Sequence, residues 1–355
     1  MAHLFDPFTL RSITLRNRIG VSPMCQYSAE EGRANDWHLV HLGARATGGA
    51  GLVIVEATAV EARGRITPGD LGLWNDSQIE PLARITRFLK AHGSVPGVQL
   101  AHAGRKASAA LPWAGGAHLS DAEGGWTPVG PSASAFGGAL NRVPAALSVA
   151  EIKAVQAAFV AATRRALAAG FAWVELHSAH GYLGHSFYSP LSNQRTDEYG
   201  GSFENRIRFT VETAQQMRAV WPDHLPLTVR ISATDWTEGG WTPEDSVALA
   251  HRLKSVGVDL IDCSTGGNVA TASIPLAPGY QVPFAEQIRR EAALPTAAVG
   301  LITDPAQADA IVREGRADVV LLARESLRDP NWPLRAEKAL RGKAAGSPVQ
   351  YLRAW

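Results

Sequence analysis

Short apolar runs alternate with amphipathic stretches along most of the chain. The runs are rich in Val, Ile, Leu and Ala, and most lack the polar alternation of a strand with one exposed face. Strands buried on both faces are typical of parallel sheets covered by helices. Eight such strands are predicted: Arg18–Pro23, Gly51–Ala57, Pro96–Ala101, Ala172–His177, Leu227–Ser232, Leu260–Ser264, Thr296–Val299 and Asp318–Leu322.

Helical stretches with recognisable ends lie between these strands. Ser148 and Glu151 form a capping box at the start of a long helix, and Gly170 closes it. Pro243 stands in the first turn of another helix. Helices are predicted at Trp37–Thr47, Asp76–His92, Ser148–Ala169, Ser202–Trp221, Thr242–Gly257 and Thr303–Gly315.

This alternation of strands and helices predicts an α/β fold, a (β/α)8 TIM barrel, rather than an open doubly wound sheet. One segment, from about His102 to Leu147, has no long periodic pattern and is rich in Gly, Pro, Ala and Ser. It follows the third strand, so we expect an extended loop that forms a lid or rim over the active-site end. No linker divides the chain, and residues 1–355 are expected to form a single domain.

Composition excludes several classes of protein. The formal net charge of +1 gives no electrostatic reason to expect nucleic acid or an anionic membrane as a partner. No apolar run approaches the ~20 residues that span a bilayer, and the first residues lack the pattern of a secretory signal. Two cysteines, Cys25 and Cys263, do not make a disulfide scaffold and fit a reducing cytosol, so a cytoplasmic protein is expected.

A polar cluster follows directly after the fourth predicted strand. His177, His180 and Tyr182 fall where the strand ends and a loop begins, which is where TIM barrels place their active sites. Two imidazoles and a phenol can donate hydrogen bonds to a substrate oxygen, and a phenol can also deliver a proton. Spacing alone does not decide this, because His38 and His41 repeat it inside a predicted helix.

The same histidines could instead hold a metal. A zinc site needs three or four ligands, usually His, Cys or a carboxylate. Glu175 is close in sequence and shares its side of the strand with His177 but not clearly with His180. The chain contains no C-x-x-C or H-E-x-x-H pattern. A metal-dependent hydrolase on the same barrel that uses His177 and His180 therefore stays as an alternative, although no metal is expected.

Other polar residues follow the remaining strands. TIM barrels bind phosphate after strands seven and eight, where Gly300 permits close approach of the backbone and Arg324 can pair with a phosphate. Arg230 and Gln99 stand deeper in the predicted barrel and could contact an electron-rich heterocycle. Together they indicate a phosphorylated cofactor, and no Gly-x-Gly-x-x-Gly motif follows a strand to suggest a Rossmann fold.

With these residues, the chain resembles the flavin-dependent ene-reductases of the old yellow enzyme family. The resemblance extends over essentially the whole sequence. The segments that carry it are Leu4–Phe8, Leu15–Arg18, Ser22–Met24, Gln99–Arg105, His177–Leu183, Phe187–Asn193, Arg195–Ser202, Asp304–Pro305, Ala323–Arg324 and Asp329–Pro330.

The resemblance implies FMN as the cofactor, with NADPH or NADH as the reductant. It implies reduction of α,β-unsaturated carbonyl or nitro compounds, in which His177 and His180 hold the substrate oxygen and Tyr182 protonates the α-carbon. Tyr27 would also touch the substrate, and Cys25 would tune the redox potential of the flavin. The residues that the resemblance places around FMN are Ser22, Pro23, Met24, Cys25, Ala57, Gln99, Arg230, Gly300, Ala323 and Arg324.

Within the family, the chain is similar to the bacterial branch that has a cysteine near the flavin, which includes the xenobiotic reductases. Cys25, Tyr27 and the histidine pair match that branch, as does the C-terminal segment Gln350–Trp355. The branch implies a homodimer or homotetramer in which Arg353 reaches the active site of a neighbouring subunit. A non-enzymatic FMN carrier is a further alternative, against which the acid-capable Tyr182 argues.

Overall fold

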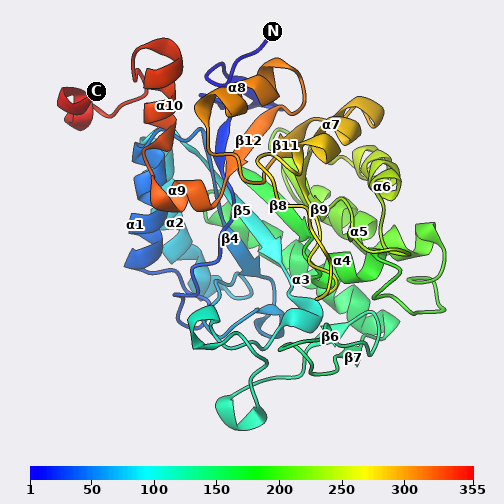
Figure 1. Cartoon of the computed structure of the whole chain (residues 1–355). Coiled ribbons are helices and arrows are strands. Elements are labelled where there is room, and N and C mark those ends of the chain that lie inside the picture. Colours follow the sequence, from blue (N-terminus) through cyan, green and yellow to red (C-terminus); the bar gives the residue numbers. More distant parts are fainter.

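The computed structural model describes all 355 residues and contains a closed barrel of eight parallel strands (Figure 1). All eight predicted strands are confirmed, with shifts of one or two residues at some ends. In their order around the barrel, the strands are β3 (Ile19–Val21), β4 (Leu52–Ala59), β5 (Val95–Ala101), β8 (Trp173–Ser178), β9 (Leu227–Ser232), β10 (Leu260–Ser264), β11 (Thr296–Ala298) and β12 (Val319–Leu322).

Helices pack around the outside of this barrel (Figure 1). The six predicted helices are present as α1 (Asp36–Thr47), α2 (Ile79–Ala91), α3 (Val149–Ala168), α5 (Phe203–Arg218), α6 (Pro243–Ser255) and α8 (Pro305–Arg313). Four more were not predicted, and two of these are too short to show a helical period. They are α4 (Leu183–Tyr188), α7 (Val282–Glu291), α9 (Arg324–Arg328) and α10 (Trp332–Arg341). None of the helices has the length and apolarity needed to cross a membrane.

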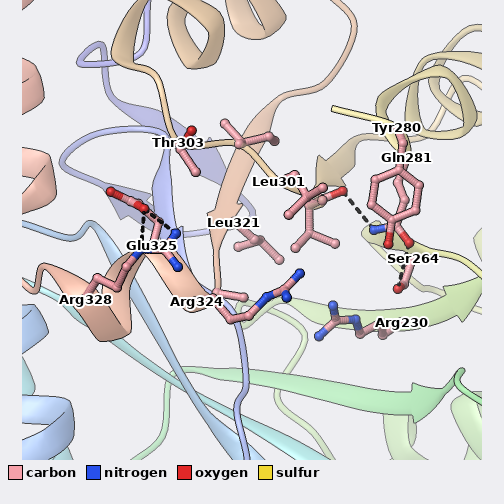
Figure 2. A pocket seen from close by; sticks show the side chains of 14 residues that line it. Arg230, Ser264, Tyr280, Gln281, Leu301, Thr303, Leu321, Arg324, Glu325 and Arg328 are labelled. Atoms are coloured by element: carbon pink, nitrogen blue, oxygen red, sulfur yellow. Dashed lines mark hydrogen bonds and ion pairs between the residues drawn. The ribbon is translucent and has the colours of Figure 1, made fainter. Parts of the chain in front are cut away.

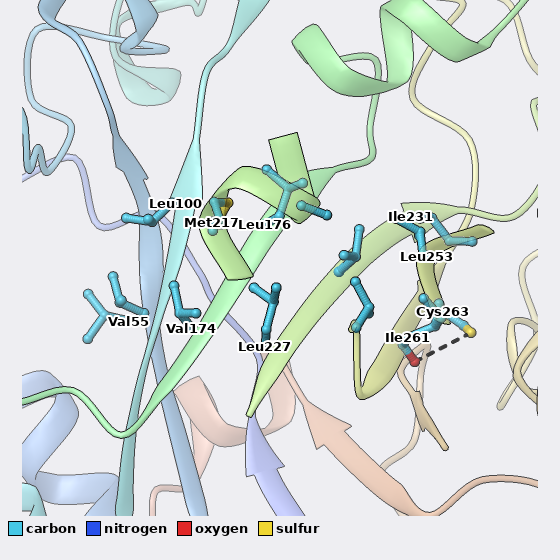
Figure 3. Close-up of a cluster of buried hydrophobic side chains, with 14 of the residues drawn as sticks. Val55, Leu100, Val174, Leu176, Met217, Leu227, Ile231, Leu253, Ile261 and Cys263 are labelled. Atoms are coloured by element: carbon cyan, nitrogen blue, oxygen red, sulfur yellow. Dashed lines mark hydrogen bonds between the residues drawn. The ribbon is translucent and has the colours of Figure 1, made fainter. Parts of the chain in front are cut away.

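Side chains along the strands alternate between the barrel interior and the layer of helices. Val174 and Leu176 of β8 belong to the large apolar cluster, which also contains Met217 of α5 (Figure 3). Their neighbours Glu175 and His177 are buried too, but their contacts are with other strands of the barrel and with the site at its end. Burial on both faces explains why the strands read as continuous apolar runs.

One end of the barrel is closed by an N-terminal hairpin that the sequence pattern did not predict. Strand β1 (Phe8–Leu10) pairs antiparallel with β2 (Ile13–Leu15). Its apolar side chains join a second buried cluster with residues near the strand starts, including Leu52, Trp173 and Leu260. This plug fills the amino end of the barrel, and the functional side chains lie at the opposite, carboxyl end.

The extended segment after β5 lies at the carboxyl end of the barrel, as predicted. It contains three short 3-10 helices, η3 (Gly104–Lys106), η4 (Pro112–Ala114) and η5 (Asp121–Glu123), and a two-stranded parallel pair, β6 (Val129–Gly130) and β7 (Ala145–Ala146). Lys106 at its start contacts the loops that follow β8 and β10. The segment thus adds a second layer of chain around the site.

Strand register brings distant polar residues together. Gln99 pairs with Glu175, which pairs with Thr228, so these three lie at one level of the barrel. One step closer to the carboxyl end, His177 pairs with Arg230. These levels form the floor of the site described next.

Candidate active site

His177, at the end of β8, is held in one tautomer. Its Nδ1 accepts a hydrogen bond from the backbone N–H of Ala179 at 3.1 Å, so the proton of the neutral ring sits on Nε2. That nitrogen lies 3.3 Å from Nδ1 of His180. His177 therefore presents its only N–H toward His180.

His180 has an unusual backbone conformation, with φ at 59°, which non-glycine residues rarely adopt. Its N–H donates to Oγ of Ser232 at 2.9 Å, and its C=O accepts from Nζ of Lys106 at 2.7 Å. Its ring Nε2 lies 2.7 Å from Oγ of Ser264. Strained backbone of this kind persists where surrounding contacts enforce it, and it concentrates at functional sites.

Tyr182 completes the predicted trio. Its ring packs edge-on against His177, with 4.9 Å between the ring centroids, and lies 6.4 Å from the ring of His180. Burial raises the pKa of Tyr182 well above its ordinary value, and the nearby Cys25 and Tyr27 add to this effect. The phenol therefore keeps its proton at neutral pH.

Both histidines are uncharged. Burial lowers the pKa of His177 and of His180 well below the ordinary value, and the positive charge of Arg230 lowers both further. Each ring is then a neutral hydrogen-bond donor, and neither changes charge between about pH 6 and 8. His177, His180 and Tyr182 together provide neutral donors and one protonated acid at a single point.

Cys25 and Tyr27 follow β3, and each adds to the raised pKa of Tyr182. Burial raises the pKa of the Cys25 thiol well above its usual value, so the group stays protonated. Tyr27 also has a left-handed backbone, with φ at 53°. The buried carboxyl of Glu56 accepts the N–H of Gln26 at 2.7 Å, which anchors the turn between Cys25 and Tyr27.

A cavity of about 250 Å³ opens beside this trio, between the ends of the last strands (Figure 2). The guanidinium groups of Arg230 and Arg324 both point into it. Glu325 also lines the cavity, but its carboxylate pairs with Arg328 at 2.6 Å. Arg324 forms no ion pair, and the one acidic partner of Arg230, Asp262, does not line the cavity, so the two guanidinium groups favour an anionic ligand.

Gly300 forms another wall of the cavity with a φ of 128°. A Cβ at this position would lie 3.0 Å from Nε2 of Gln281, so only glycine leaves the backbone open to a ligand. Ala323 precedes Arg324 and also lines the cavity. The lining of this cavity has the cations and the open backbone that a phosphate group, such as that of FMN, would need.

The floor of the site contains a buried carboxyl group, that of Asp262, which was not predicted from the sequence. Nε2 of Gln99 donates to Oε1 of Glu175 at 2.9 Å, which turns the amide oxygen of Gln99 away from that carboxyl. Arg230 donates to Oγ of Ser22 at 3.1 Å and forms an ion pair with Asp262 at 3.2 Å. Asp262 could have been recognised in the sequence, because a carboxylate inside a buried apolar strand requires a polar or charged partner.

Other predicted residues are placed as follows. Pro23 and Met24 continue the chain between Ser22 and Cys25, and Ala57 is buried in β4. Arg353 is exposed on the terminal 3-10 helix η6 (Val349–Ala354), which extends away from the barrel beyond α10 (Figure 1). Within a single chain, Arg353 is thus separate from the site at the barrel end.

The metal alternative lacks its ligands. Nowhere in the 355 residues do three or more His, Cys, Asp or Glu side chains form a group that could hold a metal ion. Glu175 faces Gln99 and Thr228 rather than the histidines. His38 and His41 are buried in α1, and burial lowers the pKa of both. They are core residues of that helix.

Solved structures support the same barrel. Morphinone reductase superposes with a TM-score of 0.80 at 27% identity, over 95% of this chain and 90% of that chain. An old yellow enzyme homologue from Zymomonas mobilis gives a TM-score of 0.76 at 27% identity, over 96% and 93% of the two chains.

Sequence comparisons give the family. The NADPH dehydrogenase of Geobacillus sp. (strain WCH70) is 49% identical over 354 residues, which cover 99% of this chain and 98% of that protein. The NADPH dehydrogenase of Bacillus subtilis (strain 168) is 47% identical over 354 residues, or 99% of each protein. A model of the NADH:flavin oxidoreductase / NADH oxidase family matches residues 3–343. The chain therefore belongs to the NADH:flavin oxidoreductase / NADH oxidase family, a family of FMN-dependent oxidoreductases, as its resemblance to the old yellow enzymes predicts.

Proposed function

We propose that this protein is an FMN-dependent NADPH dehydrogenase that reduces the C=C bond of α,β-unsaturated carbonyl or nitro compounds. The observation that carries the proposal is the convergence of His177, His180 and Tyr182 next to a cavity that fits a phosphorylated cofactor. The name shared by the near-full-length relatives supports NADPH as the reductant. The proposal treats the whole chain as one functional domain, because β3, β4, β5 and β8 to β12 all belong to one closed barrel.

We assign the phosphate of FMN to the cavity between Arg324 and Gly300, and its ring system to the residues deeper in the barrel. When bound, FMN supplies hydride chemistry, taking a hydride from NADPH or NADH and giving it to the β-carbon of the substrate. Arg230 and Gln99 present a cation and an amide to the ring. The remaining proposed contacts are Ser22, Pro23, Met24, Cys25, Ala57 and Ala323.

His177 and His180 bind the carbonyl or nitro oxygen of the substrate. Negative charge develops on that oxygen when hydride reaches the β-carbon, and preorganised donors stabilise it. Nε2–H of His177 is already a donor. Without substrate, Nδ1 of His180 accepts from Nε2–H of His177. His180 donates to a substrate oxygen from Nδ1 in its other tautomer, in which its Nε2 accepts from the hydroxyl of Ser264.

Tyr182 holds the proton that completes the reaction. An enolate carbon is a much stronger base than a phenolate, so transfer from the phenol oxygen to the α-carbon is favourable. The new C–H bond takes the proton, and the phenolate left on Tyr182 regains one from water. Tyr27 contacts the substrate, and the protonated thiol of Cys25 adjusts the redox potential of the flavin.

The decisive experiment follows the flavin directly. We expect the purified protein to be yellow, to bleach when NADPH is added without oxygen, and to regain its colour when cyclohexenone is added. Absorbance at the flavin band measures both steps. Colourless protein that cannot be reconstituted with FMN would refute the proposal, and NADPH oxidation without turnover of any enone, maleimide or nitroalkene would reject ene-reduction.

Arg324→Met tests the phosphate site. Loss of a charge-assisted hydrogen bond should weaken FMN binding by roughly 10- to 100-fold. Arg328→Met is the matched control, because that side chain lines the same cavity but pairs with Glu325. The dissociation constant comes from the recovery of flavin fluorescence on dilution. Equal weakening in both variants would argue against a specific role for Arg324.

We further propose a homodimer or homotetramer in which Arg353 enters the active site of a neighbouring subunit. Two observations support this. Arg353 is exposed on a terminal segment that leaves its own barrel, and Val349 and Leu352 beside it are exposed apolar residues that an interface would cover.

Removing the residues after Val349 should raise KM for the substrate several-fold, since a cation that contacts it is lost. Steady-state kinetics measures this, and sedimentation velocity reports the assembly. Arg353→Ala in the full chain separates the charge from the segment. An unchanged KM in both variants would show that Arg353 does not reach a site.

A further inference from the structure

Lys106 is partly buried against the active-site loops and has no role in the function proposed above. It ends η3, the 3-10 turn that follows β5. Its Nζ donates to the backbone carbonyl of His180 at 2.7 Å and to that of Gly267, which follows β10. The ammonium group of Lys106, which follows β5, therefore links the loops that follow β8 and β10.

The charge of Lys106 has no acidic partner. None of the ion pairs of the molecule includes it, and the acceptors that it uses are neutral carbonyl oxygens. Two aromatic faces complete its surroundings, with Nζ at 4.0 Å from the ring centroid of Phe136 and 5.6 Å from that of Tyr182. A desolvated cation near a ring face is attracted by the electron density of the ring.

This arrangement has a consequence for proton donation. When Tyr182 gives up its proton, the ring acquires negative charge, and a cation above it stabilises the product of that step. Lys106 and Tyr182 are both partly buried, so solvent screens the interaction less than it would at the surface. The bond to the His180 carbonyl also helps to keep that residue in its left-handed conformation, beside Tyr182.

We propose that Lys106 is a positioning residue for the reduction step, which promotes proton transfer from Tyr182 by placing a positive charge over its ring. The inference rests on the proposed role of Tyr182 as the proton donor. It assigns no part to Lys106 in the transfer of hydride from NADPH, because the ammonium acts through the phenol.

The pH dependence gives the inference a distinctive readout. Burial, with a smaller contribution from Arg105, lowers the pKa of Lys106 to about 7. The cation is therefore present below that pH and is lost as the pH rises through it. The increase in the rate of proton transfer from Tyr182 that the cation provides should disappear as the pH rises through 7.

Other titratable groups around Lys106 do not change in that range. Burial lowers the pKa of His177, His180 and His185, which keeps them neutral, and raises that of Tyr182, which keeps it protonated. Arg105 beside it stays charged, since burial lowers its pKa only to about 10. Helix α4 contributes His185 and Tyr188, and burial raises the pKa of Tyr188, which keeps its phenol protonated. Strand β6 contributes no titratable residue.

The test measures the two half-reactions separately by anaerobic stopped-flow. In Lys106→Met holoenzyme, we expect cyclohexenone to reoxidise the reduced flavin about 10-fold more slowly at pH 6. Reduction by NADPH should stay within about 2-fold, and the fall in the reoxidation rate near pH 7 should vanish. Lys106→Arg should keep most of the rate and carry it to higher pH, since Arg stays charged.

Lys153→Met is the matched control. Lys153 also lies over a tyrosine, with its Nζ 5.3 Å from the ring centroid of Tyr199, but on the outer surface of the barrel. We expect no change in either half-reaction. A double-mutant cycle then tests whether Lys106 acts through Tyr182. In the Tyr182→Phe background, Lys106→Met should slow reoxidation by less than about a further 2-fold.

Equal slowing of both half-reactions, an unchanged pH profile, or a full additional loss in the Tyr182→Phe background would overturn the inference. If Tyr182→Phe itself leaves reoxidation unchanged, the proton-donor role fails, and the inference fails with it. If Lys106→Met does not fold with FMN, the pH profile of Lys106→Arg decides, since a fall near pH 7 that persists there contradicts the role of Lys106.

Discussion

Tyr182→Phe is expected to slow the reduction of cyclohexenone by about 10²- to 10⁴-fold, the range that a positioned general acid contributes. The substitution removes one hydroxyl and keeps the ring that packs 4.9 Å from the ring of His177. Binding of substrate and transfer of hydride to the flavin should be nearly unaffected. Anaerobic stopped-flow separates the half-reactions, and slowing should appear only in reoxidation by the enone.

The control for this variant is Tyr199→Phe. It removes a phenol hydroxyl that bonds to Glu212 far from the histidine pair. Turnover by this variant should match that of the unmodified protein at a temperature where both are folded. If Tyr182→Phe slowed both half-reactions equally, the proton-donor assignment would be wrong and a packing role would take its place.

His177→Leu is expected to lower kcat/KM for enones by about 10²- to 10³-fold, the usual cost of removing one donor to a developing oxyanion. The N–H that donates is that of Nε2, because the backbone N–H of Ala179 occupies Nδ1 and fixes the ring proton on Nε2. A phenol that mimics the enolate should also bind more weakly. Steady-state kinetics and a titration followed through the flavin spectrum measure these two effects.

His177→Asn is the conservative comparison, since an amide retains one N–H donor at similar size, and we expect it to recover part of the lost rate. His251→Leu, on the exposed surface of α6, should have no effect. Because burial keeps His177 neutral, the affinity for an uncharged enone should be constant between about pH 6 and 8. A rise in affinity as the pH falls through 6.5 would show that the imidazolium is the donor instead.

The barrel was predictable because its strands are buried on both faces. Each therefore appears as a short apolar run, and the predicted strands Leu227–Ser232 and Leu260–Ser264 match β9 and β10 at both ends. The hairpin formed by β1 and β2 escaped prediction, because three residues per strand are too few for a pattern. Helix α4, which begins at Leu183, was missed for the same reason.

The active site likewise has features that the sequence predicts and features that only the structure shows. The chemistry of His177, His180 and Tyr182 could be read from their residue types at the end of a strand. Their geometry could not, since the tautomer of His177 depends on one backbone N–H and the φ of His180 depends on contacts with Ser232 and Lys106. Such contacts join residues far apart in the chain.

The sequence by itself determined the barrel, the polar cluster after the fourth strand and the family motifs, because each is written in consecutive residues. Only the tertiary structure decided that Arg230 and Arg324 share one cavity and that Lys106 lies over the ring of Tyr182. The physical reason is strand register. A barrel sets side chains from separate strands at a common level, and their charges and hydrogen bonds exist only after the barrel closes.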